Sequence, residues 1–235
     1  MPERVCLNVN LNPLDHLKRD AVENLLRFTG IEVTGYKNLE LFQGPAIYNL
    51  FPHTSHLDSW TMRLALPLKQ KHSLVFLAKK EYWDGWRRPF GELTNALILI
   101  PTAEGTFPLT AFKTAVACLS QGYSIGISAE GTRTFGPIDN RHFEDGIGLL
   151  LSMTDYKHPL VPVLLKGFGD VWPKGQNLPH WLEKSRVLFQ RKQASVHFGS
   201  PKFYKKEDLA KREDLVESFR QHCISEYHKQ FNDAE

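Results

Sequence analysis

Residues 46–58 read Ala-Ile-Tyr-Asn-Leu-Phe-Pro-His-Thr-Ser-His-Leu-Asp. The first six residues are mostly apolar, which is typical of a buried strand, and a helix-like run begins at Ser59. His53 and Asp58 therefore lie five residues apart where a predicted strand gives way to a predicted helix. At such a junction a carboxylate can orient an imidazole that stays open to substrate, as proton transfer to and from an acyl acceptor requires.

Short apolar runs alternate with helix-like runs along the chain. The predicted strands are residues 31–34, 46–51, 74–78, 97–101, 123–128, 160–165 and 195–198, and the predicted inner helices are 59–68, 109–121 and 146–153. This alternation indicates an α/β fold with a largely parallel central sheet flanked by helices. Such sheets bind ligands at the carboxyl ends of their strands. Pro162 interrupts an apolar run, which favours an edge position or a strand start for that segment, although the run also fits a core strand.

Both ends of the chain are predicted to be helical. Residues 10–29 carry leucines at helical spacing before Gly30, and residues 206–231 form a long charged amphipathic pattern. No repeat, low-complexity tract or linker divides the sequence. We therefore expect a single domain over residues 1–235, with its core at about residues 30–200.

Composition narrows the classes of function. The chain has 235 residues, a net charge of +3 and a pI of about 8.7. This charge is too weak to predict a nucleic-acid partner, although it is compatible with an acidic carrier protein or with peripheral membrane contact. The three cysteines are far apart in sequence and indicate free thiols. Neither a secretory signal nor a membrane-spanning apolar run is recognisable, so we expect a cytoplasmic protein that contacts membranes at most peripherally.

A second motif follows the predicted strand 123–128. Glu130, Gly131, Thr132 and Arg133 occupy a position where a glycine permits close backbone approach to a ligand. The planar guanidinium of Arg133 suits phosphate or carboxylate. The same residues can also form an ordinary polar turn with a surface ion pair.

The His53–Asp58 stretch has alternative interpretations. Ser55 and Asp58 fit a helix capping box, in which Asp58 has only a structural role. Alternatively, His53, His56 and Asp58 are three potential metal donors, as in a metallohydrolase. The tight His-x-His-x-Asp-His run of such enzymes is absent.

Taken in order, three motifs resemble those of the glycerolipid acyltransferase family, which includes 1-acylglycerol-3-phosphate acyltransferases. His53 and Asp58 match its His-x4-Asp motif, residues 130–133 match its Glu-Gly-Thr-Arg motif, and residues 161–163 match its Val-Pro-Val strand. The resemblance covers roughly residues 30–200.

The resemblance implies a glycerol-3-phosphate acyltransferase-like fold and transfer of a fatty acyl group to an acceptor hydroxyl or amine. The donor would be a thioester on coenzyme A (acyl-CoA) or on acyl carrier protein. His53 would be the general base and Asp58 its orienting partner. The acceptor site would be lined by Glu130, Gly131, Thr132 and Arg133. No metal or other cofactor is expected. A non-catalytic lipid- or carrier-binding module is a further alternative.

Three departures from the family pattern affect the expected acceptor. Pro52 replaces the usual Asn before the histidine, no arginine lies between Arg88 and Arg133, and residues 143–146 read Phe-Glu-Asp-Gly where a lysine is usual. The last two changes remove positive charge, and each lost charge-assisted contact to a phosphate costs about 1.5–3 kcal/mol. We therefore expect an acceptor other than ordinary lysophosphatidate or glycerol phosphate.

Overall fold

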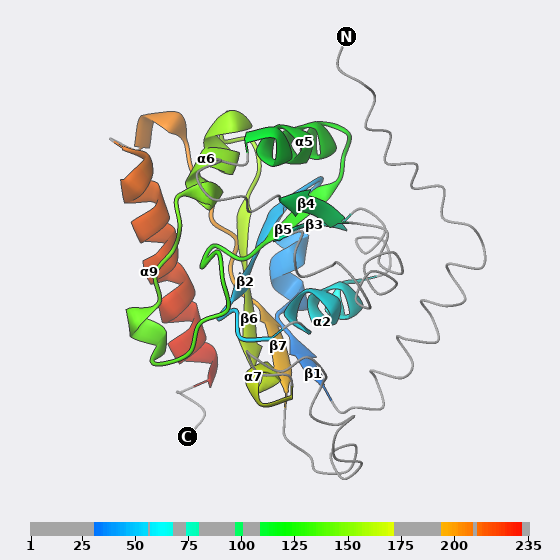
Figure 1. Cartoon of the computed structure of the whole chain (residues 1–235), viewed down its shortest axis with the longest axis vertical. Helices are drawn as coiled ribbons and strands as arrows, with labels where there is room; N and C mark the ends of the chain where they lie inside the picture. Colours follow the sequence, from blue (N-terminus) through cyan, green and yellow to red (C-terminus); the bar gives the residue numbers. More distant parts are fainter. Residues whose placement is uncertain are drawn as a thin grey trace, which may run out of the picture.

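The computed structural model describes residues 31–55, 57–67, 74–79, 97–100, 109–171, 194–208 and 211–231. Within these residues one seven-stranded sheet has the order β1-β7-β6-β2-β5-β3-β4 (Figure 1). The strands are β1 (Glu32–Thr34), β2 (Ile47–Phe51), β3 (Leu74–Lys79), β4 (Leu97–Ile100), β5 (Ser124–Ile127), β6 (Leu160–Lys166) and β7 (Ser195–Phe198). Strands β6 and β7 are antiparallel, and the other neighbouring pairs are parallel. The prediction of a largely parallel sheet is confirmed.

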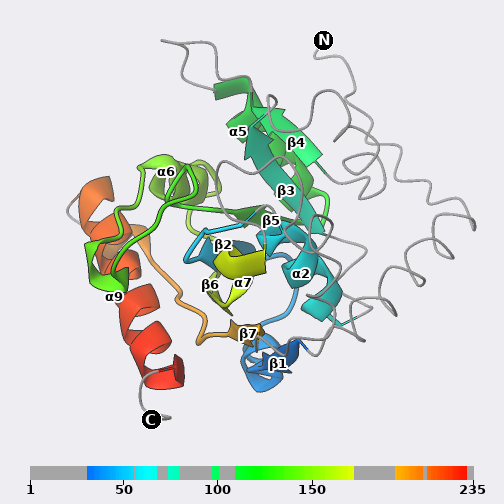
Figure 2. The ribbon, with the colours of Figure 1, turned by 60° about the horizontal axis from the view of Figure 1, so that its bottom comes forward.

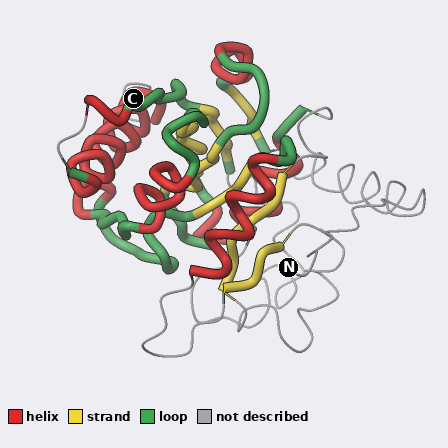
Figure 3. Tube along the Cα trace, turned by 90° about the horizontal axis from the view of Figure 1, so that it is seen from above, coloured by secondary structure: helices red, strands yellow, loops and turns green. Residues whose placement is uncertain are grey.

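Helices cover both faces of the sheet, as the sequence predicts. The α-helices are α2 (Asp58–Ala65), α5 (Leu109–Ser120), α6 (Gly146–Met153), α7 (Phe168–Val171) and α9 (Arg212–Phe231), and the 3-10 helices are η1 (Tyr36–Leu41), η4 (Ile138–Asn140) and η6 (Lys206–Asp208). Figure 2 shows α6 and α9 on one side of the strands and α2 on the other. Figure 3 shows the strands enclosed between these helical layers.

The alternation of side chains along β2 explains the two cores. Ile47 and Phe51 are fully buried in the cluster that includes residues of α5, α6 and α9. Tyr48 and Leu50 are buried in the cluster that includes Met62 of α2. Successive side chains of a strand point to opposite faces, so a strand covered on both faces is a continuous apolar run. Burying each large apolar side chain contributes about 1.5–3 kcal/mol.

The position of Pro162 decides between the alternatives of the sequence analysis, in favour of a core strand. β6 lies between β7 and β2, so Pro162 is in an interior strand and not at a sheet edge. The ladder with β7 begins at the next residue, Val163. The Pro162 carbonyl oxygen accepts the Gly199 N–H at 2.9 Å, on the β7 side. Since the N–H of a strand residue points to the same side as its C=O, the missing N–H of Pro162 removes no bond to β2.

The C-terminal helix begins later than predicted. α9 starts at Arg212 and not at residue 206, because the preceding residues Lys206–Asp208 form the separate 3-10 helix η6. Asp214 Oδ2 accepts the Lys211 N–H at 3.0 Å, which satisfies one donor at the helix start. The predicted N-terminal helix at residues 10–29 lies outside the described residues.

The next two findings concern the cysteines and the helices of the described residues. Cys118 and Cys223 are both free and buried, as expected for unpaired thiols. In the described part of the chain, no helix combines the length and the apolar character that crossing a membrane requires.

Candidate active site

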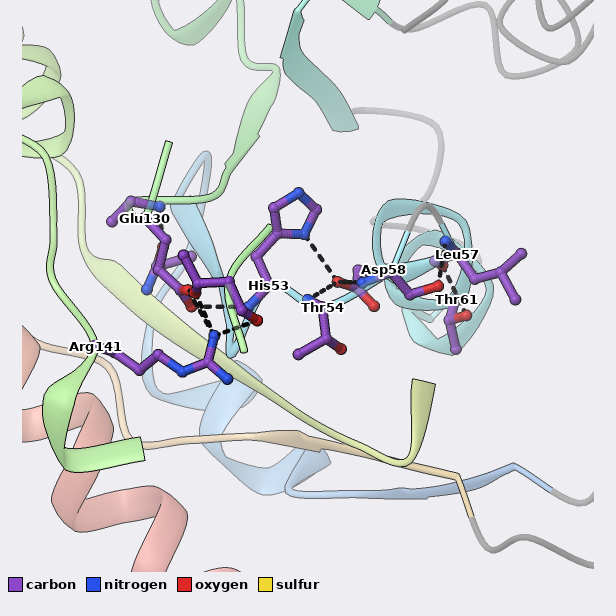
Figure 4. A network of polar contacts seen from close by, with 11 residues as sticks. His53, Thr54, Leu57, Asp58, Thr61, Glu130 and Arg141 are labelled. Carbon is purple, nitrogen blue, oxygen red and sulfur yellow. Dashed lines mark hydrogen bonds and ion pairs between the residues drawn. The ribbon is translucent and has the colours of Figure 1, made fainter. Parts of the chain in front are cut away.

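The first motif lies at the carboxyl end of β2. His53 Nδ1 is 2.8 Å from Asp58 Oδ2, so the structure brings together the two residues that the sequence analysis pairs. The Asp58 side chain is fully buried, whereas the His53 side chain is 23% exposed. In Figure 4 the imidazole lies with one nitrogen directed at Asp58 and the rest of the ring directed away from it.

Asp58 also organises the loop between β2 and α2. Its Oδ2 accepts the backbone N–H groups of Thr54 and Ser55, each at 2.9 Å. The Ser55 hydroxyl in turn accepts the Leu57 N–H at 3.2 Å. The Asp58 carboxylate accepts the Ser55 N–H as in a capping box, but Leu57 is the N-cap of α2 and no side-chain bond caps the helix, so the predicted box with Ser55 as its first residue is not formed. One carboxylate oxygen binds both the loop backbone and the imidazole. The bonds from the Thr54 and Ser55 N–H groups fix the position of the Asp58 carboxylate relative to the His53 ring.

The contact with Asp58 selects one form of the His53 ring. A carboxylate oxygen only accepts, so Nδ1 carries the hydrogen that points at Asp58. In the neutral ring Nε2 then has a free lone pair and can take a proton from a substrate. General base catalysis needs a base held in a fixed orientation, and the buried Asp58 carboxylate orients the His53 ring in this way.

The second motif follows β5, the parallel neighbour of β2. The two motifs therefore meet at the end of the sheet where the carboxyl ends of these strands lie. Glu130 is 4% exposed, and its Oε1 accepts the backbone N–H of His53 at 2.8 Å. The Thr134 N–H donates to the His53 carbonyl oxygen at 3.0 Å. Residues 130–134 therefore contact the backbone of His53 directly. The alternative interpretation of this segment, an ordinary polar turn with a surface ion pair, is wrong.

Arg141 is part of this network and was missed by the sequence analysis. Its Nη1 donates to Glu130 Oε2 at 3.0 Å, and its side chain is only 5% exposed (Figure 4). Arg141 lies in an irregular stretch after the second motif, and no spacing rule links it to Glu130. The one available signal is that it is the first basic residue after Arg133.

The remaining residues of the second motif differ in exposure. Gly131 is exposed and has a φ of 67°, a left-handed conformation that favours glycine. A Cβ at this position would lie 2.9 Å from the Glu144 Cγ. Thr132 is partly exposed, and Arg133 is 7% exposed. Gly131 and Thr132 therefore present this turn to solvent beside His53.

The acidic segment that departs from the family pattern is held against α9. Asp145 Oδ1 accepts Arg212 Nε at 2.8 Å, and Phe143 is buried with its ring 5.5 Å from that of Phe51. The Glu144 N–H donates to the Ala129 carbonyl oxygen at 2.7 Å. The carboxylate of Asp145 is therefore paired with a helix residue. Residues 80–96 and 101–108, on either side of the strand near which the family has a further arginine, lie outside the described residues.

The alternative metal site has one ligand outside the described residues, His56. Within the described ranges, no three His, Cys, Asp or Glu side chains are grouped so that they could hold a metal ion. Asp58 Oδ2 already accepts three donors, as shown above. The metallohydrolase alternative stays a prediction.

Comparisons with known proteins relate the chain to enzymes of acyl transfer. Curated protein sequences give no match. Among solved structures, the 1-acyl-sn-glycerophosphate (LPA) acyltransferase PlsC from Thermotoga maritima is similar, with a TM-score of 0.56 and 16% sequence identity over 95% of this chain and 85% of that chain. This likeness supports the α/β fold. The model of the family described as Acyltransferase matches residues 30–166, more than half of the sequence and a range that contains both motifs. The chain therefore belongs to the acyltransferase family.

Proposed function

We propose that this protein transfers a fatty acyl group from a thioester to a hydroxyl or amine of an acceptor, with His53 as the general base and Asp58 as its orienting partner. The 2.8 Å contact between His53 Nδ1 and the buried Asp58 Oδ2 is the observation that carries this proposal. Family membership supports acyl transfer in general, and the contact supports His53 and Asp58 as the residues that would perform it. The donor is acyl-CoA or acyl carrier protein.

The proposed reaction balances without a cofactor. His53 Nε2 takes the proton of the acceptor hydroxyl or amine while the acceptor atom attacks the thioester carbonyl carbon. The carbon–sulfur bond then breaks, and the imidazolium returns its proton to the leaving thiolate. Asp58 stabilises the imidazolium and keeps the ring in one orientation. General base assistance of this kind contributes about 10²- to 10⁴-fold to the rate.

The acceptor is proposed to bind beside residues 130–133. Gly131 and Thr132 are accessible to it at the turn, and the buried Arg133 can supply a cationic fork. Glu130 anchors this segment to the backbone of His53. We further propose that the acceptor is not an ordinary lysophosphatidate or glycerol phosphate, because a segment where basic residues are usual is acidic here and its Asp145 pairs with Arg212.

The proposal is tested by mass spectrometry of acyl transfer. Purified protein is mixed with acyl-CoA or acyl carrier protein donors and with lysophosphatidate, glycerol phosphate, neutral alcohols and amines. We expect transfer to at least one acceptor, and its loss in His53→Ala. His142→Ala is the matched control, since His142 is exposed. A fully active His53→Ala variant would exclude the proposed mechanism.

Three further outcomes separate the alternatives. Stoichiometric zinc in the purified protein, with activity lost on chelation, would support the metallohydrolase alternative. Efficient acylation of lysophosphatidate would contradict the proposed acceptor but leave the enzyme class in place. Binding of the thioester without transfer to any acceptor would support the non-catalytic module.

A further inference from the structure

Glu130 joins the two segments that carry the candidate active site. Its Oε1 accepts the His53 N–H at 2.8 Å, and its Oε2 accepts from Arg141 Nη1 at 3.0 Å. The Thr134 hydroxyl donates to the same Oε2, and the Thr134 N–H donates to the His53 carbonyl oxygen at 3.0 Å. The backbone of His53 is therefore held on both its N–H and its C=O by the segment that begins at Glu130.

Arg141 closes this segment into a fixed loop. Beyond its bond to Glu130, Nη1 donates to the Thr134 carbonyl oxygen at 2.6 Å, and Nη2 donates to the Gly136 carbonyl oxygen at 3.2 Å. A planar guanidinium can reach several acceptors in fixed directions, which an ammonium cannot match. Arg220 of α9 donates to the Arg141 carbonyl oxygen at 3.1 Å, so the backbone of Arg141 is itself attached to a helix.

The burial of this pair indicates a role beyond stability. The side chains of Glu130 and Arg141 are 1% and 5% exposed. Buried ion pairs can often be replaced by apolar residues with little loss of stability, because taking two charges out of water offsets their attraction. An apolar residue at position 130, however, could not accept the His53 N–H. Loss of Arg141 alone would leave the buried Glu130 carboxylate without this ion-pair partner.

We propose that Arg141 is a positioning residue for acyl transfer, which acts through Glu130 to hold the backbone of His53. Asp58 fixes the ring of His53 from one side, and the Glu130–Arg141 pair fixes its main chain from the other. Both constraints are needed to place Nε2 against the acceptor, since displacement of a catalytic group by about 1 Å can cost on the order of 10²-fold in rate. This inference rests on the proposed acyl-transfer function.

The test combines steady-state kinetics with amide hydrogen exchange. In Arg141→Gln we expect kcat to fall about 10- to 100-fold, with the KM for donor and for acceptor changed less than threefold. Arg141→Lys retains the charge but not the fork, so its kcat should be intermediate. We expect the His53 amide to exchange at least tenfold faster in Arg141→Gln. Lys113→Gln is the control, because Lys113 is exposed on α5 and its replacement should leave both readouts unchanged.

The outcomes are separable from those of the proposed function. Wild-type kcat in folded Arg141→Gln would overturn the inference, as would an unchanged exchange rate of the His53 amide. If Arg141→Gln does not fold, wild-type kcat in Arg141→Lys would overturn it instead. If the wild-type protein transfers no acyl group, the proposed function fails, and an unchanged His53 amide would still exclude the positioning contact.

Discussion

Asn49 and Ala129 connect β2 to the second motif: the Asn49 side-chain Oδ1 accepts the Ala129 backbone N–H at 2.8 Å. Asn49 is fully buried, and its amide nitrogen also lies 3.7 Å from Cys223 Sγ on α9. Ala129 directly precedes Glu130, so this bond fixes the point where the second motif leaves the sheet. A polar residue inside an apolar strand thus has a positional role in the site.

Replacement of Asn49 should destabilise the protein. Asn49→Ala leaves the Ala129 N–H without its acceptor, and an unsatisfied buried donor costs about 1–3 kcal/mol. Urea denaturation measures the change in the free energy of unfolding. Asn140→Ala is the control, because Asn140 is exposed in η4 and its replacement should change stability by less than about 0.5 kcal/mol. Equal stability of the two variants would show that the Asn49–Ala129 bond contributes nothing.

Asp58→Asn should reduce activity far more than stability. If the asparagine oxygen takes the place of Oδ2, it can accept the loop N–H groups and the Nδ1 hydrogen, but the neutral side chain no longer stabilises the imidazolium. We expect kcat to fall by about 10²- to 10⁴-fold. Kinetics and thermal unfolding check this together. Asp155→Asn, at an exposed position, should behave as the wild type. A kcat within threefold of the wild type would contradict the proposed role of Asp58.

Gly35 and Gly44 offer a matched test of backbone requirements. Both have a positive φ, 81° and 88°, which costs a non-glycine residue roughly 1–2 kcal/mol. A Cβ at Gly44 would meet nothing within 4 Å, whereas one at Gly35 would collide with the Phe198 carbonyl oxygen. Gly35→Ala should therefore lose about 1–3 kcal/mol more than Gly44→Ala in urea denaturation. Equal losses would mean that the Phe198 contact relaxes without cost.

Stability should fall as the pH drops below about 6.5, the ordinary pKa of histidine. Burial lowers the pKa of His197 and of His222, against a raising effect of the nearby Glu226 on both and of the Ser200 carbonyl on His222. Lys229 lowers the pKa of His197, and Lys202 that of His222. The unfolded chain then binds more protons than the folded chain below pH 6.5, so stability present above that pH is lost on acidification.

Thermal unfolding between pH 7.5 and 5 measures this loss, with a slope of at most about 1.4 kcal/mol per pH unit for each proton. His222→Gln should reduce the slope, because glutamine binds no proton in this range. Its amide can still donate to the Ser200 carbonyl oxygen, which His222 Nε2 contacts at 2.8 Å, so the local structure is kept. His142→Gln, at an exposed position, should keep the wild-type slope. Measurements stay above pH 5, since the lowered pKa of Glu226 affects stability only below about 4.5. An unchanged slope in His222→Gln would refute this account.

Two elements differ from the sequence analysis in features that contacts with other segments decide. The apolar run containing Pro162 was predicted to be an edge strand, a strand start or a core strand, and β6 is an interior strand whose Pro162 carbonyl oxygen accepts the Gly199 N–H on the β7 side. The helix predicted over residues 206–231 begins only at Arg212, because residues 206–208 form the 3-10 helix η6. Sequence periodicity defines the centre of an element better than its ends or its neighbours, since those depend on bonds to distant residues.

The sequence by itself determined the alternation of strands and helices, because apolar periodicity depends on nearest neighbours along the chain. It also determined the pairing of His53 with Asp58, which needs only one loop of five residues. Only the tertiary structure decided the strand order, the contact of Glu130 with the His53 backbone and the role of Arg141. Those contacts join residues that are 11 or 77 positions apart, and no local pattern encodes which of many polar side chains will meet once the sheet has formed.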